Sequence, residues 1–133
     1  MAKPTMFHSL TFEDAARGME FMEALGFRKV AVYTDEADPN IVVHGEYHWR
    51  ENGGVMFGSK RSDSPFANTT GQSKCYLVTE SDADVDRIYE TALGAGATSI
   101  REPQDPEYGG REASVADQEG NLWSFGSYPG AST

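Results

Sequence analysis

The chain has 133 residues, of which 24% are charged and 38% hydrophobic, a balance typical of a globular domain and too apolar for a disordered chain. No apolar run approaches the roughly 18 residues that a transmembrane helix needs. The first residues lack an apolar stretch followed by a small-residue cleavage site, so we expect no secretory signal. A single cysteine, Cys75, excludes an internal disulfide framework and a multi-cysteine zinc site, and a reducing, cytoplasmic setting is expected.

Acidic side chains outnumber basic ones, with 21 Asp and Glu against 11 Lys and Arg and a formal net charge of −10. The acid is concentrated in the second half: residues 1–70 carry seven basic and ten acidic side chains, and residues 71–133 carry four and eleven. This balance disfavours nucleic acid and anionic membranes as partners. Two interpretations stay open, a well-solvated surface and a binding site that prefers cationic or metal-bearing ligands.

The pattern of apolar and turn residues over residues 1–59 predicts five elements in the order β-α-β-β-β. Leu10–Phe12 is a short apolar strand, and Asp14 is a suitable N-cap for a helix that ends near Gly26. Strand-like segments follow, separated by turns rich in Asp, Asn, Pro and Gly, at residues 28–34, 41–50 and 55–59.

The same order recurs after a polar stretch, residues 60–73, which we interpret as a linker. We expect the second module to span residues 74–128 and a short tail to follow at 129–133. Its predicted elements are a strand at 74–79, a helix at 82–93 and strands at 98–101, 113–116 and 121–127.

Internal matches support a duplication. Adding 70 maps Asp14 onto Asp84 and Gly26 onto Gly96, and adding 68 maps residues 57–59, Phe-Gly-Ser, onto the same three residues at 125–127. The fold class is therefore α+β, with two tandem modules. Because half a chain of this size buries little surface, we expect the halves to pack together, either within a chain or across a dimer.

Several phrases along the chain are typical of one superfamily. The second module contains Tyr108-Gly109-Gly110-Arg111 and then Asp117-Gln118-Glu119-Gly120-Asn121, in which Gln118 replaces the usual proline. The first module contains Leu25-Gly26-Phe27 and His44-Gly45-Glu46. In this order, on a duplicated module, they resemble the vicinal-oxygen-chelate superfamily of glyoxalase, bleomycin-resistance proteins and extradiol dioxygenases.

The resemblance implies a curved mixed sheet, or cup, with helices on its outer face and, commonly, a dimer. Members that catalyse reactions usually hold a divalent metal on residues of the first and last strands of both modules. One of these ligands is a Glu four residues after the hairpin glycine, since a carboxylate holds a hard cation and leaves positions open for a bidentate substrate.

The residues at these positions predict that the usual metal site is lost. Four residues after Gly120 stands Ser124, and its repeat partner is Met56. A hydroxyl and a thioether are poor ligands for the cations that this family uses. The first-strand positions, counted back from the helix starts, are Phe7, with His8 beside it, and Leu77, flanked by Tyr76.

One other cluster could replace the missing ligands. His44, Glu46 and His48 alternate along a predicted strand, so their side chains share one face. Three interpretations stay open: polar residues on an open sheet face, contacts to a ligand without a metal, and a zinc or iron site. The opposite face is apolar and is expected to pack under a helix; it carries Ile41, Val43, Tyr47 and Trp49.

Further candidates lie near the expected mouth and floor of the cup. Tyr108 and Arg111 sit at the mouth in the family pattern, although Arg111 could instead pair with an acidic neighbour. Leu122 and Ser124 should face the cup, whereas Trp123 and Phe125 should pack beneath the second helix. We expect Tyr47, Trp49 and Tyr108 to supply aromatic rings near the rim, and Cys75 to be an ordinary strand residue.

Two functions compete at this point. The first is a binding protein, a homodimer whose metal-free cup holds a planar aromatic, antibiotic-like small molecule, with no cofactor and no catalytic residue. The second is a metal-dependent lyase, isomerase or dioxygenase of the glyoxalase type with a rearranged metal site. The predicted ligand-contacting residues are His44, Glu46, His48, Trp49, Met56, Tyr108, Arg111, Leu122 and Ser124.

Overall fold

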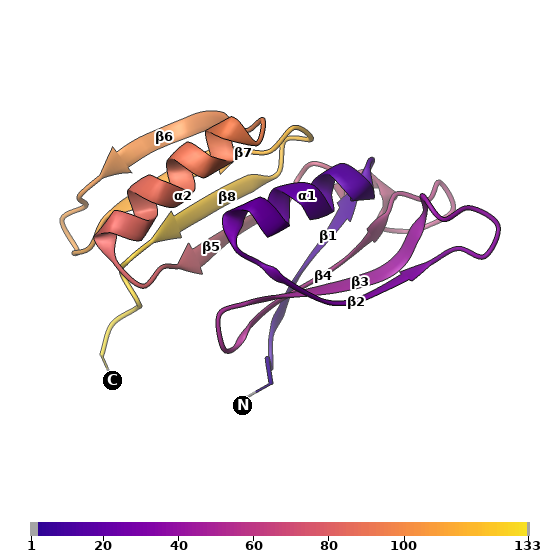
Figure 1. The fold of residues 1–133 in the computed structure, drawn as a ribbon, viewed down its shortest axis with the longest axis horizontal. Coiled ribbons are helices and arrows are strands. Elements are labelled where there is room, and N and C mark those ends of the chain that lie inside the picture. Colours follow the sequence, from indigo (N-terminus) through magenta and orange to yellow (C-terminus); the bar gives the residue numbers. More distant parts are fainter. Residues whose placement is uncertain (1–2, 133) are drawn as a thin grey trace. The chain divides into compact units, whose positions relative to one another are not determined.

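The computed structural model describes residues 3–132, and the chain divides between Ser73 and Lys74 into two compact units. Each unit contains a four-stranded sheet and one α-helix (Figure 1). The α+β class and the two tandem β-α-β-β-β modules are therefore confirmed. None of the helices in the described part of the chain combines the length and the apolarity needed to cross a bilayer.

The first unit forms one mixed sheet in the order β1-β4-β3-β2. The outer strand β1 runs parallel to β4, and the other neighbours are antiparallel. Its elements are β1 (Phe7–Phe12), α1 (Ala15–Leu25), β2 (Arg28–Thr34), β3 (Val42–Trp49), β4 (Gly53–Ser59) and a short 3-10 helix, η1 (Ala67–Thr69).

The second unit repeats that topology in the order β5-β8-β7-β6, again with a parallel outer pair, β5 and β8. Equal strand order and equal strand directions in the two units are what a duplicated module predicts. Its elements are β5 (Lys74–Val78), α2 (Asp82–Gly94), β6 (Thr98–Gln104), β7 (Glu112–Ala116) and β8 (Leu122–Gly126).

The two helices start differently. The Asp14 carboxylate caps α1 by accepting from the Arg17 amide at 3.1 Å, as the sequence predicts. In α2 the cap is Ser81, whose hydroxyl accepts from the Asp84 amide at 3.2 Å. Asp84 therefore lies inside the first turn of α2, three residues beyond the residue that corresponds to Asp14.

Each sheet has one face packed against its helix, which we call the covered face, and an opposite open face. In the first unit the buried side chains of α1 include Phe21, Met22 and Leu25, which pack with strand residues such as Phe12 and Phe57. In α2 the buried residues are Val85, Ile88, Tyr89 and Ala92, the face that a helical period predicts. Burial of these faces supplies the apolar core of each unit.

An irregularity recurs in the outer antiparallel strand of each sheet. The pairing of β2 with β3 shifts between Lys29 and Ala31, and the pairing of β6 with β7 shifts between Ser99 and Arg101. The residues at the two shifts, Val30 and Ile100, are 50% and 56% exposed, so each bulge turns an apolar side chain outward.

Candidate ligand-binding site

Strand β8 shows the alternation that separates the two faces. Trp123 and Phe125 have no exposed surface and lie on the covered face, while Leu122 and Ser124 are half-buried on the open face. These orientations confirm the prediction from the sequence. The residues of β8 that remain available to a ligand are therefore Leu122 and Ser124.

On the open face of each sheet, the outer strand and its parallel inner neighbour contribute one pair of adjacent positions. In the first unit Met56 lies beside Ser9, and in the second Ser124 lies beside Tyr76. Leu77, which the sequence analysis proposed for the second sheet, is only 7% exposed and lies on the covered face. Counting back from Asp84 fails because α2 is capped three residues earlier, and an odd shift along a strand reverses the face.

The remaining first-strand residues occupy opposite faces. His8 pairs with the buried Val55 and so lies on the covered face, where burial lowers its pKa. Phe7 lies on the open face, and its ring covers Gly54. The ring fits there because Gly54 has no side chain: a Cβ at this position would lie 2.5 Å from the Phe7 ring. The Phe7 ring also contacts His48, with ring centroids 6.3 Å apart. Together Phe7, His48 and Met56 give the first open face an apolar and aromatic floor.

These positions do not fit the divalent metal site that the family resemblance implies. The donors at these four positions are the hydroxyls of Ser9 and Ser124, the thioether of Met56 and the phenol of Tyr76. A neighbouring carboxylate, that of Glu46 beside Met56, is engaged by His44. The Ser124 hydroxyl lies 2.7 Å from that of Ser114, so the two hydroxyls satisfy each other. Within residues 3–132, no three His, Cys, Asp or Glu side chains converge on a point that could hold a metal ion.

His44, Glu46 and His48 share the open face of β3, as the alternation predicts. They do not act as one group. The imidazole Nε2 of His44 lies 2.9 Å from a carboxylate oxygen of Glu46, and the Tyr33 ring stacks on His44 with centroids 6.4 Å apart. His48 belongs instead to the ring contact with Phe7. The cluster therefore offers a hydrogen-bonded pair at one end of the strand and an aromatic contact at the other.

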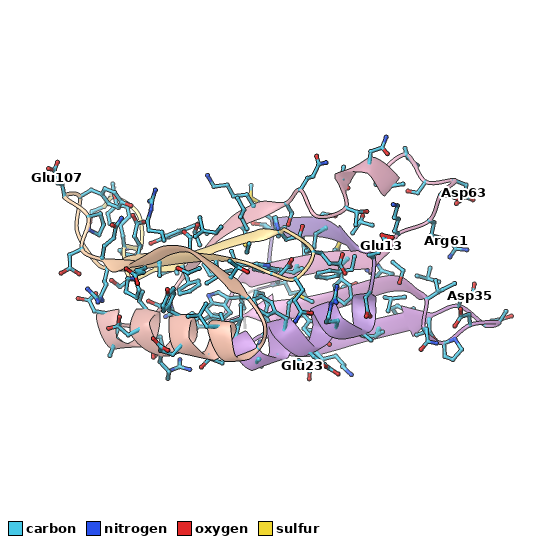
Figure 2. All side chains as sticks on the ribbon, turned by 90° about the horizontal axis from the view of Figure 1, so that it is seen from above. Glu13, Glu23, Asp35, Arg61, Asp63 and Glu107 are labelled. Carbon is cyan, nitrogen blue, oxygen red and sulfur yellow. The ribbon has the colours of Figure 1, made fainter. Side chains whose placement is uncertain are left out.

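Two of the rings predicted near the rim lie on the covered face. Tyr47 is fully buried, and its hydroxyl donates to the carboxylate of Glu23, labelled on α1 in Figure 2, at 2.6 Å. Trp49 packs against Phe27, with ring centroids 5.0 Å apart. Both residues thus lie on the face opposite His44 and His48, as the sequence predicts, and the contact of Trp49 with a ligand stays a prediction.

The apolar face predicted for β3 also needs one correction. The pairing of β3 with β2 shifts at Val43, and this places Val42 in the core while Val43 is 53% exposed. A bulge reverses the alternation at its end of the strand. Strict alternation from Tyr47 could not show this, because the bulge depends on the partner strand.

The open face of the second sheet ends in a pocket of about 520 Å³. Three tyrosines, Tyr76, Tyr108 and Tyr128, line it together with Val78, Glu112 and the segment 129–130. Tyr108 is the residue that the sequence singled out; it follows Glu107, labelled at the loop tip in Figure 2. Tyr76, Glu112 and Tyr128 were missed, although the alternation of β5, anchored on Ser81, would have placed Tyr76 on the open face.

Hydrogen bonds fix the polar atoms of this pocket. The Tyr108 hydroxyl donates to Glu112 at 2.6 Å, and the Tyr76 hydroxyl donates to the Tyr128 carbonyl at 2.9 Å. The bond to Glu112 raises the pKa of Tyr108, and burial, followed by the charge of Glu112, raises the pKa of Tyr76. Arg101 approaches the other oxygen of Glu112 at 3.6 Å and is itself 56% exposed.

Arg111 forms ion pairs with acidic neighbours, the alternative that the sequence left open. Its guanidinium bonds Asp86 of α2 at 3.0–3.2 Å and Asp105 at 3.0 Å, and these two bonds raise its pKa. The side chain thus joins the helix to the loop before β7, on the covered side. The ion pair that the sequence left open as the alternative is therefore present, and the contact of Arg111 with a ligand stays a prediction.

The hairpin phrase at 117–123 is held by one buried carboxylate. Asp117 accepts from the amides of Glu119 and Asn121, from the Asn121 side chain and from the Trp123 indole, all at 2.9–3.1 Å. Gly120 supplies the positive φ, 97°, that closes the turn. These contacts explain why Asp, Gly, Asn and an aromatic residue occur at this spacing.

Cys75 lies on the covered face of β5, beside Trp123. Burial raises the pKa of its thiol to about 12. Because the thiolate is the reactive form, burial disfavours reaction of this thiol near neutral pH, which agrees with the prediction of an ordinary strand residue.

Comparisons with known proteins agree with this architecture. Solved structures that superimpose on the chain include TioX from Micromonospora sp. ML1, at 24% identity and a TM-score of 0.67, covering 91% of this chain and 95% of that one. A PhnB protein from Bacillus cereus matches at 16% identity and a TM-score of 0.70, over 92% and 98% of the two chains. A glyoxalase I mutant from Zea mays matches at 15% identity and a TM-score of 0.68, over 93% of this chain and 45% of that one.

At sequence identities this low, structural similarity establishes a shared fold but says nothing about a shared ligand. No curated protein matches the sequence significantly. A model of the glyoxalase/bleomycin resistance protein/dioxygenase superfamily, however, matches residues 6–125. That match spans both modules and includes the Asp117 hairpin. The chain therefore belongs to the glyoxalase/bleomycin resistance protein/dioxygenase superfamily.

Proposed function

We propose that the protein binds a planar aromatic small molecule on the open faces of its sheets, without a metal. One observation carries the proposal: Met56 and Ser124 occupy the central open-face positions of the two sheets, where a metal-using relative would need carboxylates. Met56 gives the first sheet a soft thioether and Ser124 gives the second sheet an uncharged hydroxyl, and each suits the face of a ring better than it suits a divalent cation.

The surroundings of Met56 support an aromatic ligand. Phe7 and His48 form a ring contact on the same open face, and Tyr33 and His44 form a second one. Methionine adapts to flat, polarisable surfaces and makes favourable sulfur–aromatic contacts. The floor thus offers a planar ligand apolar contact from Met56 and Phe7, and hydrogen bonding from the His44–Glu46 pair.

The charge of the protein favours ligands that are neutral or positive. The net charge is −10, and an acidic surface concentrates cations near it while repelling small anionic acids. Desolvating an anionic oxyacid on these faces would have no metal charge to offset it.

The test is calorimetric titration of the full chain with quinoline, a planar neutral ring system, compared with lactoylglutathione and catechol in the presence of zinc or manganese. Heat is the better signal because Trp49 and Trp123 both lie on covered faces. We expect micromolar to millimolar binding of quinoline, weakened in Met56→Glu and largely retained in Met56→Leu. Turnover of lactoylglutathione or catechol with added metal, and no binding of quinoline, would reject the proposal.

We also propose that the protein works as a cytoplasmic homodimer. A single cysteine suits a reducing compartment, and modules of this size gain stability by sharing a core. Sedimentation at micromolar concentration should give a mass near twice 14.5 kDa. A folded monomer at that concentration would count against the dimer but not against the ligand.

A further inference from the structure

The tyrosine pocket of the second unit has the geometry of a partial aromatic cage. The rings of Tyr108 and Tyr128 stand almost perpendicular, at 71°, with centroids 5.0 Å apart, and so form a corner. Tyr76 adds a third ring along the same cavity. Tyr76 and Tyr108 are 42% and 58% exposed, so a ligand that enters from solvent can reach both.

A glycine makes this arrangement possible. Gly126 ends β8 directly beside the Tyr76 hydroxyl, and a Cβ at that position would lie 2.5 Å from the phenol oxygen and 2.9 Å from the Arg111 carbonyl. Without that side chain, Tyr76 reaches across the strand end and bonds the Tyr128 carbonyl. The bond links β5 to the segment after β8 and holds two of the three rings in place.

The polar atoms that face the pocket are mostly acceptors. The hydroxyl hydrogens of Tyr76 and Tyr108 are already donated, to the Tyr128 carbonyl and to Glu112, which leaves their oxygen lone pairs for a ligand. Glu112 is 15% exposed and adds a carboxylate. No Lys or Arg side chain lines the cavity among the described residues. An anion would find few donors in such a pocket, whereas a cation finds acceptors and ring faces.

The charges around the pocket point the same way. Residues 71–133 carry four basic and eleven acidic side chains. Three of the four basic residues are already in ion pairs: Arg87 with Asp84, Arg101 with Glu112, and Arg111 with Asp86 and Asp105. The field at the pocket therefore attracts a positive ligand.

We propose that this pocket binds an alkylated or quaternary ammonium group, held by cation–π contact with Tyr76, Tyr108 and Tyr128 and assisted by the Glu112 carboxylate, whose other oxygen Arg101 approaches at 3.6 Å. The inference deepens the proposed function and rests on it: the cage recognises the charged end of a small molecule whose planar part lies on the open face of the same, second sheet. A bulky methylated cation is weakly hydrated, so an apolar pocket with ring faces accepts it at little cost in desolvation.

The experiment compares choline with 3,3-dimethylbutan-1-ol, which has the same shape but carbon in place of the charged nitrogen. Both are titrated into the full chain by calorimetry. We expect choline to bind about five- to thirtyfold more tightly than its neutral isostere. Because choline keeps its charge at every pH, the difference reports the charge alone.

Two test variants and two controls locate the site. Tyr108→Leu should weaken choline binding about two- to fivefold, the effect of one exposed ring, while Tyr108→Phe keeps the ring and most of the affinity. Glu112→Gln should also weaken it and leave the neutral isostere unchanged. Phe66→Leu, an exposed ring on the first unit that belongs to neither proposed site, serves as the matched control and should have no effect. Near-ultraviolet circular dichroism of the buried Trp123 checks that each variant is folded.

The outcomes separate this inference from the proposed function. Equal affinities for choline and its isostere, or an unchanged affinity in Tyr108→Leu, would overturn the ammonium site even if quinoline binds. Selective binding of choline without any binding of quinoline would retain the cage and reject the planar ligand. Tighter binding of N-methylquinolinium than of either quinoline or choline is expected if one molecule uses both features.

Discussion

The two units share a topology, yet they differ in how each stabilises its own fold and in what its open face offers. The first has an apolar and aromatic floor around Met56, with a histidine–glutamate pair at one end. The second has paired hydroxyls at its centre and a tyrosine pocket at its end. Duplication therefore preserved the covered faces, which need apolar packing, while the open faces diverged in chemistry.

The largest difference concerns the hairpin before the last strand of each unit. In the second unit, Asp117 accepts from four donors, and three of these hydrogen bonds are buried. Asp117→Ala would leave these donors without an acceptor, so we expect a loss of about 3 kcal/mol or more in the free energy of unfolding, measured by urea titration. Glu51→Ala, in the exposed turn of the first unit, is the control and should cost less than about 0.5 kcal/mol. Equal losses would show that the carboxylate does not hold the turn.

Each covered face carries a titratable residue that makes the free energy of unfolding depend on pH, Cys75 at alkaline pH and His8 at acidic pH. His8 and Cys75 occupy equivalent positions, beside Val55 and Trp123. Burial raises the pKa of Cys75 from 9.0 to about 12, so the folded state retains a proton that the unfolded state loses above pH 9. At pH 10.5 we expect this group alone to lower the free energy of unfolding by about 1–2 kcal/mol relative to pH 8. The Cys75→Ala variant should lose less of its free energy of unfolding over that pH range than the unmodified protein, as measured by urea titration.

For His8 the sign is reversed. Burial lowers the pKa below 6.5, so the stability from the neutral imidazole is present above pH 6.5 and declines as the pH falls below it. Replacing His8 by Gln should flatten the acid side of the stability profile between pH 7 and 5. An unchanged acid slope would assign that slope to other groups.

A smaller contrast lies in two buried tyrosines. Tyr47 donates to the carboxylate of Glu23, and Tyr89 donates to the hydroxyl of Ser99 at 2.7 Å. We expect Tyr47→Phe to cost about 1–2 kcal/mol and Tyr89→Phe about 0.5–1 kcal/mol, because a charged acceptor makes the stronger bond. The midpoint of urea unfolding measures both, and the reverse order would contradict the comparison.

The smallest expected effect concerns binding. Gly126→Ala should displace Tyr76 and weaken choline binding about two- to fivefold, because one ring of the cage moves. Gly58 is the equivalent residue in the first unit, where an added Cβ would come no nearer than 3.3 Å to its closest neighbour. Gly58→Ala should leave choline binding unchanged, and a parallel loss in both variants would indicate a general effect on folding.

Sequence patterns predicted the duplicated modules, the Asp14 cap, the buried face of α2 and the orientation of β8. They failed where structure depends on a distant partner. Leu77 was assigned to the wrong face because a serine three residues earlier caps α2. Val43 was misplaced by a bulge that forms only in the paired strands. The tyrosine pocket was missed because it combines residues from β5, β7 and the segment after β8, which are far apart in the sequence.

The bulges at Val30 and Ile100 bear on self-association. Both lie on the outer antiparallel strands, β2 and β6, where a regular edge would expose unpaired amides and carbonyls to a second chain. A bulge twists such an edge and breaks the spacing that strand addition requires. Edge-to-edge growth into aggregates is therefore disfavoured at these two edges, although each exposes an apolar side chain, Val30 or Ile100.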